Sequence, residues 1–318
     1  MDSCIICHNK TGNIPYKIQE MQLGLREWFN YELCAQCGSM QIATIPENLA
    51  KYYPTGNYYS FNTLLKNTSP SYISKAKAKF LIYGQFNIIG ALMSIGYKMP
   101  DYYQWMKNSH TAFNDRILDV GTGNGTLLTS LHKIGFTNLV GIDPFIDNDL
   151  DYGQVKVFKR DLFQEQNTYD LIMMHHSLEH MTRPKEVLQK AHSLLADDGR
   201  LLVRIPIMGN YGWQTYGIHY SQLDAPRHIF IPSEKGMVQL AEESGFTILK
   251  FEYDTTDFAI WSSKLYKMNI PLSEANSQAK NPRPDIFSIE DIMRFRKTAK
   301  QINEEKRGDI AAIYMQKK

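Results

Sequence analysis

Histidine and acidic side chains gather in one short stretch of this 318-residue chain. Residues 175–180 read HHSLEH, which places His175, His176, Glu179 and His180 within six positions. Imidazole and carboxylate groups at this spacing can move protons, bind a metal ion, or form a structural hydrogen-bond network. The stretch alone leaves these three alternatives open, so the residues before and after it have to be considered.

All four cysteines fall into two C-x2-C pairs. Cys4 and Cys7 form the first pair, Cys34 and Cys37 the second, and 26 residues separate them. Two such pairs supply the four thiolates of a tetrahedral zinc site, which leaves the metal no open position for catalysis. Four unrelated buried thiols would not explain the repeated spacing. The sequence therefore predicts a structural zinc ion in a small ribbon with a long hairpin.

A glycine-rich turn follows the apolar run in RILDVGTGNG. Gly121, Gly123 and Gly125 let the backbone turn sharply and let a ligand approach it closely. Asp119 lies two residues before the first of them, at the end of the expected strand. Dinucleotide dehydrogenases use a similar turn, so the turn alone does not define the ligand.

Two further carboxylates follow the next expected strands. Asp143 closes the segment NLVGIDP, where a carboxylate can accept both hydroxyls of a ribose. Asp161 follows the segment VKVFKRD, where it can accept from an exocyclic adenine amine. The carboxyl ends of parallel strands meet at one edge of a sheet, so we expect both carboxylates beside Asp119.

The elements that position these residues are strands alternating with helices, which predicts a doubly wound parallel α/β sheet. A helix over residues 185–199 is expected to end at Gly199. A later helix begins after an N-cap at Ser233, and a capping box joins Ser288 and Asp291. The expected strands cover residues 116–120, 138–144, 155–161, 169–175, 200–207, 246–254 and 309–318.

The chain divides into three expected parts. Residues 1–48 form the zinc-binding ribbon, residues 49–114 a tyrosine-rich connector and helical cap, and residues 115–318 the main domain. A polar helical insertion occupies about residues 255–307. In the connector, four tyrosines can close over a ligand or pack in a core: Tyr52, Tyr53, Tyr58 and Tyr59.

The quoted motifs, with YDLIMMHHSLEHM and LLADDGRLLVRIP, resemble the class I S-adenosylmethionine-dependent methyltransferases over about residues 115–254 and the last strand. The resemblance implies a Rossmann-like sheet of seven strands that ends in an antiparallel hairpin. It also implies S-adenosylmethionine as cofactor. Its methionine part would be held by Asp119, Gly121, Thr122 and Gly123, its ribose by Asp143 and Pro144, its adenine by Asp161 and Leu162, with backbone from His175.

A narrower resemblance joins the four-cysteine module to the segment QLDAPRHIFIPS. Together they resemble methyltransferases of bacterial surface-polysaccharide and sugar pathways, which implies a sugar or glycan acceptor, including one carried on a lipid. His180 or His228 would be the base, with Glu179 beside it. Arg227 would pair with an acidic acceptor or with Asp224, and the loop carrying His219 and Tyr220 would line the acceptor pocket.

A metal ion on the HHSLEH stretch is a further alternative. Ubiquinone-pathway O-methyltransferases are similar here and carry metal-binding glutamates, whereas this chain has His176 in place of the first of them. A set of His176, Glu179 and His180 would suit zinc or iron better than magnesium. Structural and acid–base roles for the same residues remain open beside it.

Composition restricts the class of protein. The chain is 43% hydrophobic and 21% charged, with a net charge of +2, which is typical of a globular domain without a polyanionic partner. No secretory signal opens it, so we expect a cytoplasmic protein. The uncharged run 80–97 contains Gln85, Asn87 and three glycines, which favours a helix packed on the main domain over a membrane span. Lysines 75, 77 and 79 before it keep a lipid contact open, and the oligomeric state is not indicated.

Three other functions compete with a sugar methyltransferase. An RNA methyltransferase would need a cationic face, and residues 1–60 carry four Lys or Arg against five Asp or Glu, leaving only residues 66–107 basic. A nicotinamide oxidoreductase would need G-x-G-x-x-G, and here the third glycine comes one residue early. A non-catalytic module that binds the cofactor and docks a partner remains the third.

Overall fold

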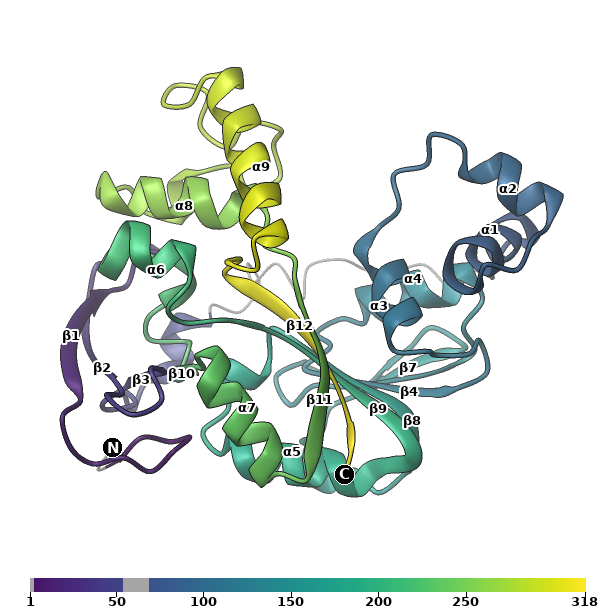
Figure 1. Cartoon of the computed structure of the whole chain (residues 1–318), viewed down its shortest axis with the longest axis horizontal. Coiled ribbons are helices and arrows are strands. Elements are labelled where there is room, and N and C mark those ends of the chain that lie inside the picture. The colour runs from purple at the N-terminus through teal and green to yellow at the C-terminus, as the bar shows by residue number, and fades with distance from the viewer. Residues whose placement is uncertain (1–2, 54–68) are drawn as a thin grey trace.

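The computed structural model describes residues 3–53 and 69–318, and its centre is a twisted, mostly parallel sheet (Figure 1). The strands β4, β5, β7, β8 and β9 run parallel to one another, and the antiparallel strands lie at the two edges. From edge to edge the strands are β11 (Phe246–Tyr253), β12 (Ile310–Lys317), β9 (Leu195–Pro206), β8 (Tyr169–His175), β4 (Arg116–Val120), β5 (Asn138–Ile142), β7 (Val155–Phe158) and β6 (Leu150–Asp151). The prediction of a doubly wound α/β sheet ending in an antiparallel hairpin is confirmed.

The prediction of seven strands is wrong by one. The eighth strand, β6, has two residues and pairs antiparallel with β7 through Leu150 opposite Val157 and Asp151 opposite Lys156. The polar sequence DNDLDYGQ shows no alternation of apolar residues. Because the strand depends on its neighbour's backbone and not on an apolar face, hydrophobic periodicity does not detect it.

Both faces of the central sheet are covered by helices. Successive residues of β8 alternate between two cores, with Leu171 and Met173 in one and Ile172 and Met174 in the other. Figure 1 shows the helices of each core on opposite sides of the sheet. The first core receives α1 (Tyr72–Tyr83), α3 (Asp101–Asn108) and α4 (Thr126–Ile134), and the second receives α5 (Pro184–Leu194) and α7 (Glu234–Glu243).

The cysteine-containing N-terminus forms a second, four-stranded sheet. The predicted hairpin consists of β1 (Ile14–Gln19) and β2 (Trp28–Leu33), and β3 (Met40–Ile42) pairs with β2. The fourth strand, β10 (Phe230–Ile231), comes from beyond the middle of the chain and pairs antiparallel with β3. The N-terminal sheet is therefore completed by the segment that directly follows His228.

Two helix boundaries differ from the sequence predictions. α5 ends at Leu194, and residues 195–199 already belong to β9, where the register with β8 shifts between Tyr169 and Leu171. The uncharged run 80–97 is no single helix, because α1 ends at Gly84 in a left-handed conformation (φ 66°) and α2 (Ile88–Ser94) follows separately. Within the described residues, no helix is long and apolar enough to cross a membrane.

The predicted helix starts at the C-terminal end of the chain are confirmed. The Ser233 side chain caps α7, and Ser288 and Asp291 form the capping box of α9 (Ile289–Glu304). Within the predicted insertion α9 packs against α8 (Asp257–Lys267), while α6 (Tyr211–Tyr216) packs against α8 from the preceding loop. Tyr58 and Tyr59 lie outside the described residues.

Candidate functional site

The glycine turn lies between β4 and α4, directly against the loop that follows β8. Gly121, Gly123 and Gly125 have φ angles of 75°, 58° and 81°, a region that side chains disfavour. A Cβ atom on Gly121 would lie 2.6 Å from the Cβ atom of Ser177. The turn therefore requires glycine for its conformation and for the close approach of the HHSLEH loop.

Asp119 and Asp143 meet beside this turn, as predicted from their strand ends. Asp119 is 3% exposed and accepts a hydrogen bond from Thr122 Oγ1 at 2.7 Å. Burial raises the pKa of Asp119 to about 7, and the charge of Asp143 adds to the shift. Asp143 accepts from the backbone N–H groups of Gly123 and Phe145, each at 2.9 Å, and burial raises its pKa as well. Pro144, which follows Asp143, is exposed.

Asp161 lies after the third parallel strand, where its carboxylate caps a short turn. Its Oδ1 atom accepts from the Phe163 backbone N–H at 2.8 Å, and Gln164 completes a capping box. Leu162 is buried, whereas Asp161 is exposed. The structure thus gives Asp161 a capping role, and its position at the sheet edge is the one expected of an adenine contact.

Buried polar atoms without partners collect in the loop after β8. Both ring nitrogens of His175, the Ser177 hydroxyl and Glu179 Oε2 have no hydrogen-bond partner among the described residues. The His175 ring lies against Trp105 of α3 at 4.4 Å between centroids, and burial holds its pKa well below the usual range. Buried polar groups are rarely left unpaired unless a ligand or water completes them. Of these residues, Ser177 lies directly against the glycine turn.

Glu179 is the last residue in a chain of polar contacts that starts at Asp254, after β11. Arg204 pairs with Asp254 and donates to Nε2 of His176. The opposite nitrogen of that ring, Nδ1, lies 3.2 Å from Glu179 Oε1 and must be the donor to it. Both nitrogens of His176 are therefore engaged, which leaves no lone pair for the metal set His176–Glu179–His180.

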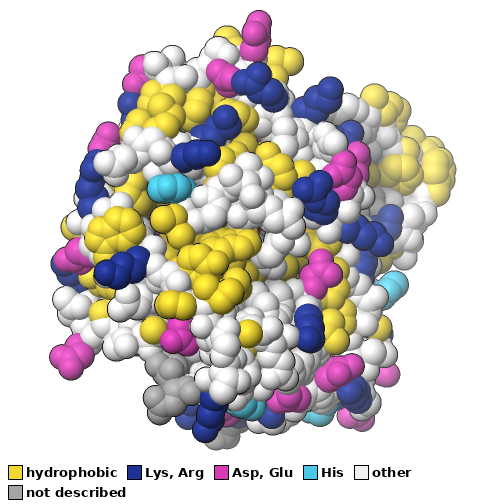
Figure 2. Space-filling view, turned by 60° about the vertical axis from the view of Figure 1, so that its left-hand side comes forward, with side chains coloured by type: hydrophobic (Ala, Val, Ile, Leu, Met, Phe, Trp, Pro, Cys, Tyr) yellow, Lys and Arg dark blue, Asp and Glu magenta, His cyan; other side chains and the backbone are white. Residues whose placement is uncertain are grey.

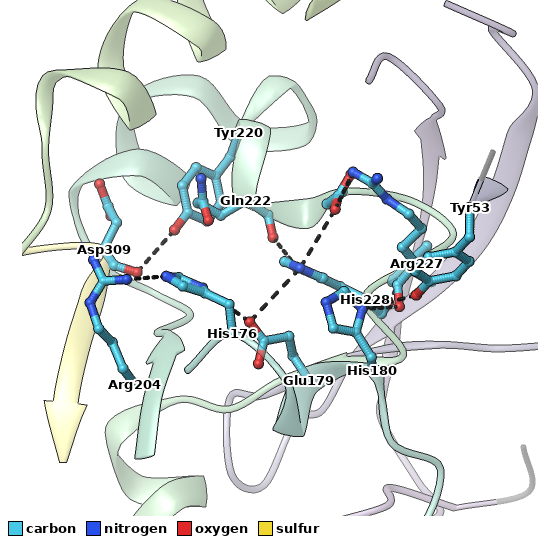
Figure 3. A network of polar contacts seen from close by, with 12 residues as sticks. Tyr53, His176, Glu179, His180, Arg204, Tyr220, Gln222, Arg227, His228 and Asp309 are labelled. Carbon is cyan, nitrogen blue, oxygen red and sulfur yellow. Dashed lines mark hydrogen bonds and ion pairs between the residues drawn. The ribbon is translucent and has the colours of Figure 1, made fainter. Parts of the chain in front are cut away.

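His180 and His228 lie side by side next to Glu179, with ring centroids 4.8 Å apart (Figure 3). Nδ1 of His180 donates to the Arg227 carbonyl at 2.9 Å, and Nδ1 of His228 donates to the Gln222 carbonyl at 2.7 Å. In the neutral form of either ring, Nε2 therefore keeps its lone pair. One donor atom each of Glu179, His180 and His228 lie within 4.8 Å of one another. The donor atoms that could share a ligand or metal ion therefore belong to Glu179, His180 and His228, and not to His176, Glu179 and His180.

The charges around the histidine pair are well defined. Burial would raise the pKa of Glu179, but the hydrogen bond from His176 and electrostatic interactions with the imidazoles of His176, His228 and His180 lower it to about 2. Burial and the neighbouring His228 lower the pKa of His180 to about 4. His228 Nε2 lies 3.9 Å from Glu179 Oε1 and 3.6 Å from Asp224 Oδ2. A neutral imidazole thus stands beside an ionised, fully buried carboxylate at pH 7.

Arg227 pairs with Asp224, one of the two partners that the sequence suggested. Its Nη2 atom donates to both carboxylate oxygens of Asp224, at 2.6 and 2.7 Å. Burial would raise the pKa of Asp224, and the charges of Arg227 and His228 lower it instead. The pair fixes the DAPRH segment just before His228.

Tyr53, one of the four tyrosines predicted to close over a ligand or to pack in a core, contacts both His180 and Phe145. Its hydroxyl lies 3.1 Å from Nδ1 of His180, and its ring stacks on Phe145 at 6.1 Å between centroids. Phe145 is 77% exposed and follows Asp143 by two residues. Phe145 was missed because an exposed aromatic residue in a loop has no local pattern.

The aromatic loop 209–220 contributes less than expected. Tyr220 is 1% exposed and donates to the Asp309 carbonyl, so it packs in the core and lines no acceptor pocket. His219 lines a shallow hollow against the N-terminal sheet with Met21 and Trp28, and none of the site residues described above lines it.

The four cysteines converge as their spacing predicts. The Sγ atoms of Cys4 and Cys37 are 3.7 Å apart, those of Cys7 and Cys34 are 3.4 Å apart, and all four side chains are buried. A tetrahedral zinc ion with Zn–S bonds of about 2.3 Å requires sulfur atoms about 3.8 Å apart. Burial raises the pKa of the Cys7 thiol to about 11. A bound cation would oppose this shift, because it stabilises the thiolate that binds it. The donor set therefore fits a structural zinc ion.

The N-terminal sheet holds the histidine site directly. The buried hydroxyl of Tyr31 in β2 donates to the His228 carbonyl at 2.8 Å. The Ile42 N–H donates to the Ile229 carbonyl at 2.9 Å, and the Ile229 N–H donates to the Glu179 carbonyl at 2.8 Å. The sheet that follows the first cysteine pair thus contacts the backbone of His228 and Ile229, and Ile229 in turn contacts Glu179.

Comparison with known proteins supports the class of protein that this geometry suggests. Residues 97–250, just under half of the chain, match the family model described as "Methyltransferase domain". This match covers the glycine turn, the three aspartates and the histidine pair. It supports a methyltransferase.

Similarity to individual proteins is confined to short segments or to the fold. The chain is 36% identical over 67 residues to EEF1A lysine methyltransferase 2 of Danio rerio, which is 21% of this chain and 29% of that protein. The human protein of that name is 45% identical over 40 residues, which is 13% of this chain and 17% of that protein. The chain thus spans less than a third of the length of these relatives.

Among solved structures, coclaurine N-methyltransferase has a TM-score of 0.42 and 13% identity, covering 79% of this chain and 90% of that chain. The [4+2]-cyclase SpnF has the same TM-score and 14% identity, covering 79% and 97%. Since these two proteins differ in reaction, similarity at this level does not define an activity.

Proposed function

We propose that the chain transfers a methyl group from S-adenosylmethionine to a hydroxyl of a sugar, a polysaccharide unit or a related small molecule. The observation that carries the proposal is the set of unpartnered buried polar atoms on His175, Ser177 and Glu179, beside the glycine turn. In this proposal, those atoms together with Asp119 and Asp143 would border one ligand position, and His180 would adjoin it.

We assign the following roles to the residues of the chain. Asp119, Gly121, Thr122 and Gly123 border the methionine part, Asp143 and Pro144 the ribose, and Asp161 and Leu162 the adenine. The bound cofactor supplies an electrophilic methyl group. A hydroxyl acceptor that attacks it must lose its proton, and positioned histidine is the usual base for such a step.

The His180–His228 pair fits that base. The ring of His180 is half-buried and neutral at pH 7, so it can face an acceptor, and His228 lies behind it. The acceptor oxygen would bond to the methyl carbon as the bond from that carbon to sulfur breaks, which leaves the demethylated cofactor as a neutral thioether. The acceptor's proton would pass to an imidazole of the pair. The carboxylates of Glu179 and Asp224 then stabilise the positive charge on the imidazole. His176 is a positioning residue, because it acts by orienting Glu179.

We further propose that Cys4, Cys7, Cys34 and Cys37 bind a structural zinc ion. The support is the sulfur spacing and the burial of all four side chains. The role of the ion would be to hold the N-terminal sheet, and through Tyr31 the backbone of His228.

A protein lysine is the second candidate acceptor. The short similarity to EEF1A lysine methyltransferase 2 favours it. The histidine pair fits either acceptor, because a lysine ammonium also has to lose a proton before it attacks.

Titration calorimetry of S-adenosylmethionine and its demethylated product, with metal content measured on the same sample, tests the class. We expect micromolar binding and one zinc ion per chain. Absence of binding by either ligand would overturn the proposed function and favour a partner-docking module. A labelled methyl donor offered with nucleotide-activated sugars, glycans and a lysine-rich protein then separates the two acceptors.

A further inference from the structure

The α1–α2 hairpin carries a concentration of exposed apolar side chains. Figure 1 shows the hairpin at the periphery of the molecule, away from the N-terminal sheet. Phe86, Ile88 and Ile95 are 78%, 68% and 79% exposed. The full set of exposed large apolar side chains in this segment is Tyr72, Ile73, Phe86, Ile88, Ile89, Leu92, Met93, Ile95, Tyr97 and Met99.

The hairpin is built so that these side chains point outward. α1 buries Ala78 and Ile82 in the core of the main domain, and Ala76 lies buried beside α2. α2 buries only Gly90, where an added Cβ atom would lie 2.6 Å from the Ala76 carbonyl oxygen. The Asn87 side chain caps α2 and donates to that same carbonyl at 3.0 Å. α2 therefore docks on α1 through backbone, and its large side chains remain outside the core.

The same segment is uniformly basic. Residues 69–100 contain four lysines, at positions 75, 77, 79 and 98, and no aspartate or glutamate. The ammonium group of Lys77 lies 3.3 Å from the centroid of the Tyr97 ring, within the apolar set. In Figure 2 hydrophobic side chains stand out at the right-hand edge, on the side where Figure 1 places this hairpin.

We propose that the α1–α2 hairpin binds the surface of a bilayer that contains anionic lipids. Apolar side chains bordered by lysines are the composition of segments that lie in the membrane interface. Lysines at that depth are attracted to anionic headgroups. Since no described helix is long and apolar enough to cross a membrane, the hairpin would lie on the surface of the bilayer.

Charge decides between a membrane and a second copy of the chain. In a symmetric dimer through this face, each hairpin would meet the same set of lysines with no acidic residue of the segment to pair with them. Like charges brought together at an apolar contact oppose association. An anionic lipid surface accepts both the apolar side chains and the lysines.

The hairpin is joined to the cofactor domain. α1 packs against α4, the helix that follows the glycine turn, and the Lys75 stem lies against Gly135 at the end of α4. Binding at a bilayer would therefore hold the sheet edge near acceptors carried on lipid. The membrane contact itself does not depend on the proposed methyl transfer.

Co-sedimentation with vesicles tests the inference. The full chain should sediment with vesicles of phosphatidylcholine and phosphatidylglycerol in equal parts, and much less with phosphatidylcholine alone. The triple variant Phe86→Ser, Ile88→Ser, Leu92→Ser should bind the anionic vesicles about a hundredfold more weakly. The matched control changes three exposed apolar residues elsewhere: Val238→Ser, Leu249→Ser, Met293→Ser. Lys75→Glu with Lys79→Glu should reduce the preference for anionic vesicles.

Each other outcome overturns the proposal. Equal loss in the triple variant and its control would remove the hairpin as the binding element. Absence of wild-type sedimentation, together with a light-scattering mass of a dimer that the triple variant loses, would make the hairpin an interface between copies. Both variants should keep S-adenosylmethionine affinity if the wild type has it, which separates a failed fold from a failed membrane contact.

Discussion

Asp119 is a buried carboxyl group whose charge depends on what is bound beside it. Burial raises its pKa to about 7, so the ligand-free protein holds it protonated below that pH. The cationic methionine part of the cofactor favours the carboxylate. Binding should therefore release a proton and become up to about tenfold tighter per pH unit between pH 6 and 7, and level off above. Calorimetry in buffers of different ionisation enthalpy measures this release.

Asp119 also affects the stability of the ligand-free protein, with a pH dependence opposite to that of cofactor binding. Because the folded-state pKa of Asp119 is raised, its contribution to stability is lost as pH rises from about 4 to 7. Asp119→Asn should raise the free energy of unfolding of the ligand-free protein by about 2 kcal/mol at pH 8 while it weakens cofactor binding. A variant that binds as tightly as the wild type, with the same pH dependence, would remove Asp119 from the site.

Asp143 is expected to hold the ribose. Asp143→Ala should weaken S-adenosylmethionine binding by at least about a hundredfold, because two charge-assisted hydrogen bonds are lost. Circular dichroism should show the fold intact. Asp147→Ala, an exposed change in the same loop, is the control and should bind normally. Unchanged affinity in Asp143→Ala would exclude the ribose assignment.

His228 is expected to act on turnover more than on binding. His228→Ala should lower kcat by about 10²–10⁴-fold, the usual contribution of a positioned base, with little change in cofactor affinity. Single-turnover transfer and cofactor titration on the same samples separate the two effects. His110→Asn, at an exposed left-handed position, is the matched control. A fully active His228→Ala enzyme would remove His228 from the mechanism.

At the scale of elements, the N-terminal sheet supports the backbone of the segment that carries His228. Tyr31→Phe removes the hydrogen bond to the His228 carbonyl and leaves that buried oxygen unpaired, a change that costs about 1–3 kcal/mol. We expect kcat to fall about tenfold while the affinity for S-adenosylmethionine is kept. If the four cysteines hold zinc as proposed, its removal by a chelator should produce the same pattern.

A tyrosine on the same sheet provides the control for this contact. Tyr16 packs edge-on against Trp213, so Tyr16→Phe should leave turnover unchanged. If Tyr31→Phe and the metal-free protein both keep full turnover, the sheet has no positioning role and serves stability or partner binding alone.

At the scale of the whole molecule, charge argues against RNA as the acceptor. The net charge is +2, and the N-terminal sheet lacks a cationic excess. We expect single-stranded RNA to bind with a dissociation constant weaker than about 10 µM at physiological salt. Filter binding with a salt titration measures this. Tight binding with a steep salt slope would revive the RNA alternative.

Local patterns in the sequence determined most of the elements and several site positions. Alternating strands and helices gave the doubly wound sheet because both faces of each central strand are buried, which leaves a strong apolar signal. Other features could be predicted because each meets a local backbone or ligand requirement. They are the glycines at 121 and 123, the two C-x2-C pairs, and the caps at Ser233 and Ser288. The short strand β6 and the boundary of α5 were not, since they depend on neighbouring backbone.

Only the tertiary structure decided which histidines work together. His180 and His228 are 48 positions apart, and their contact requires the loop after β8 to meet the segment that enters the N-terminal sheet. Their tautomers depend on the carbonyl groups of Arg227 and Gln222, and His176 is engaged on both nitrogens through Arg204. Residue types and spacing identify the groups that can do chemistry. Which of these groups share a site depends on contacts between residues far apart in the sequence. Such contacts produce no periodic pattern in the sequence, so only the tertiary structure shows them.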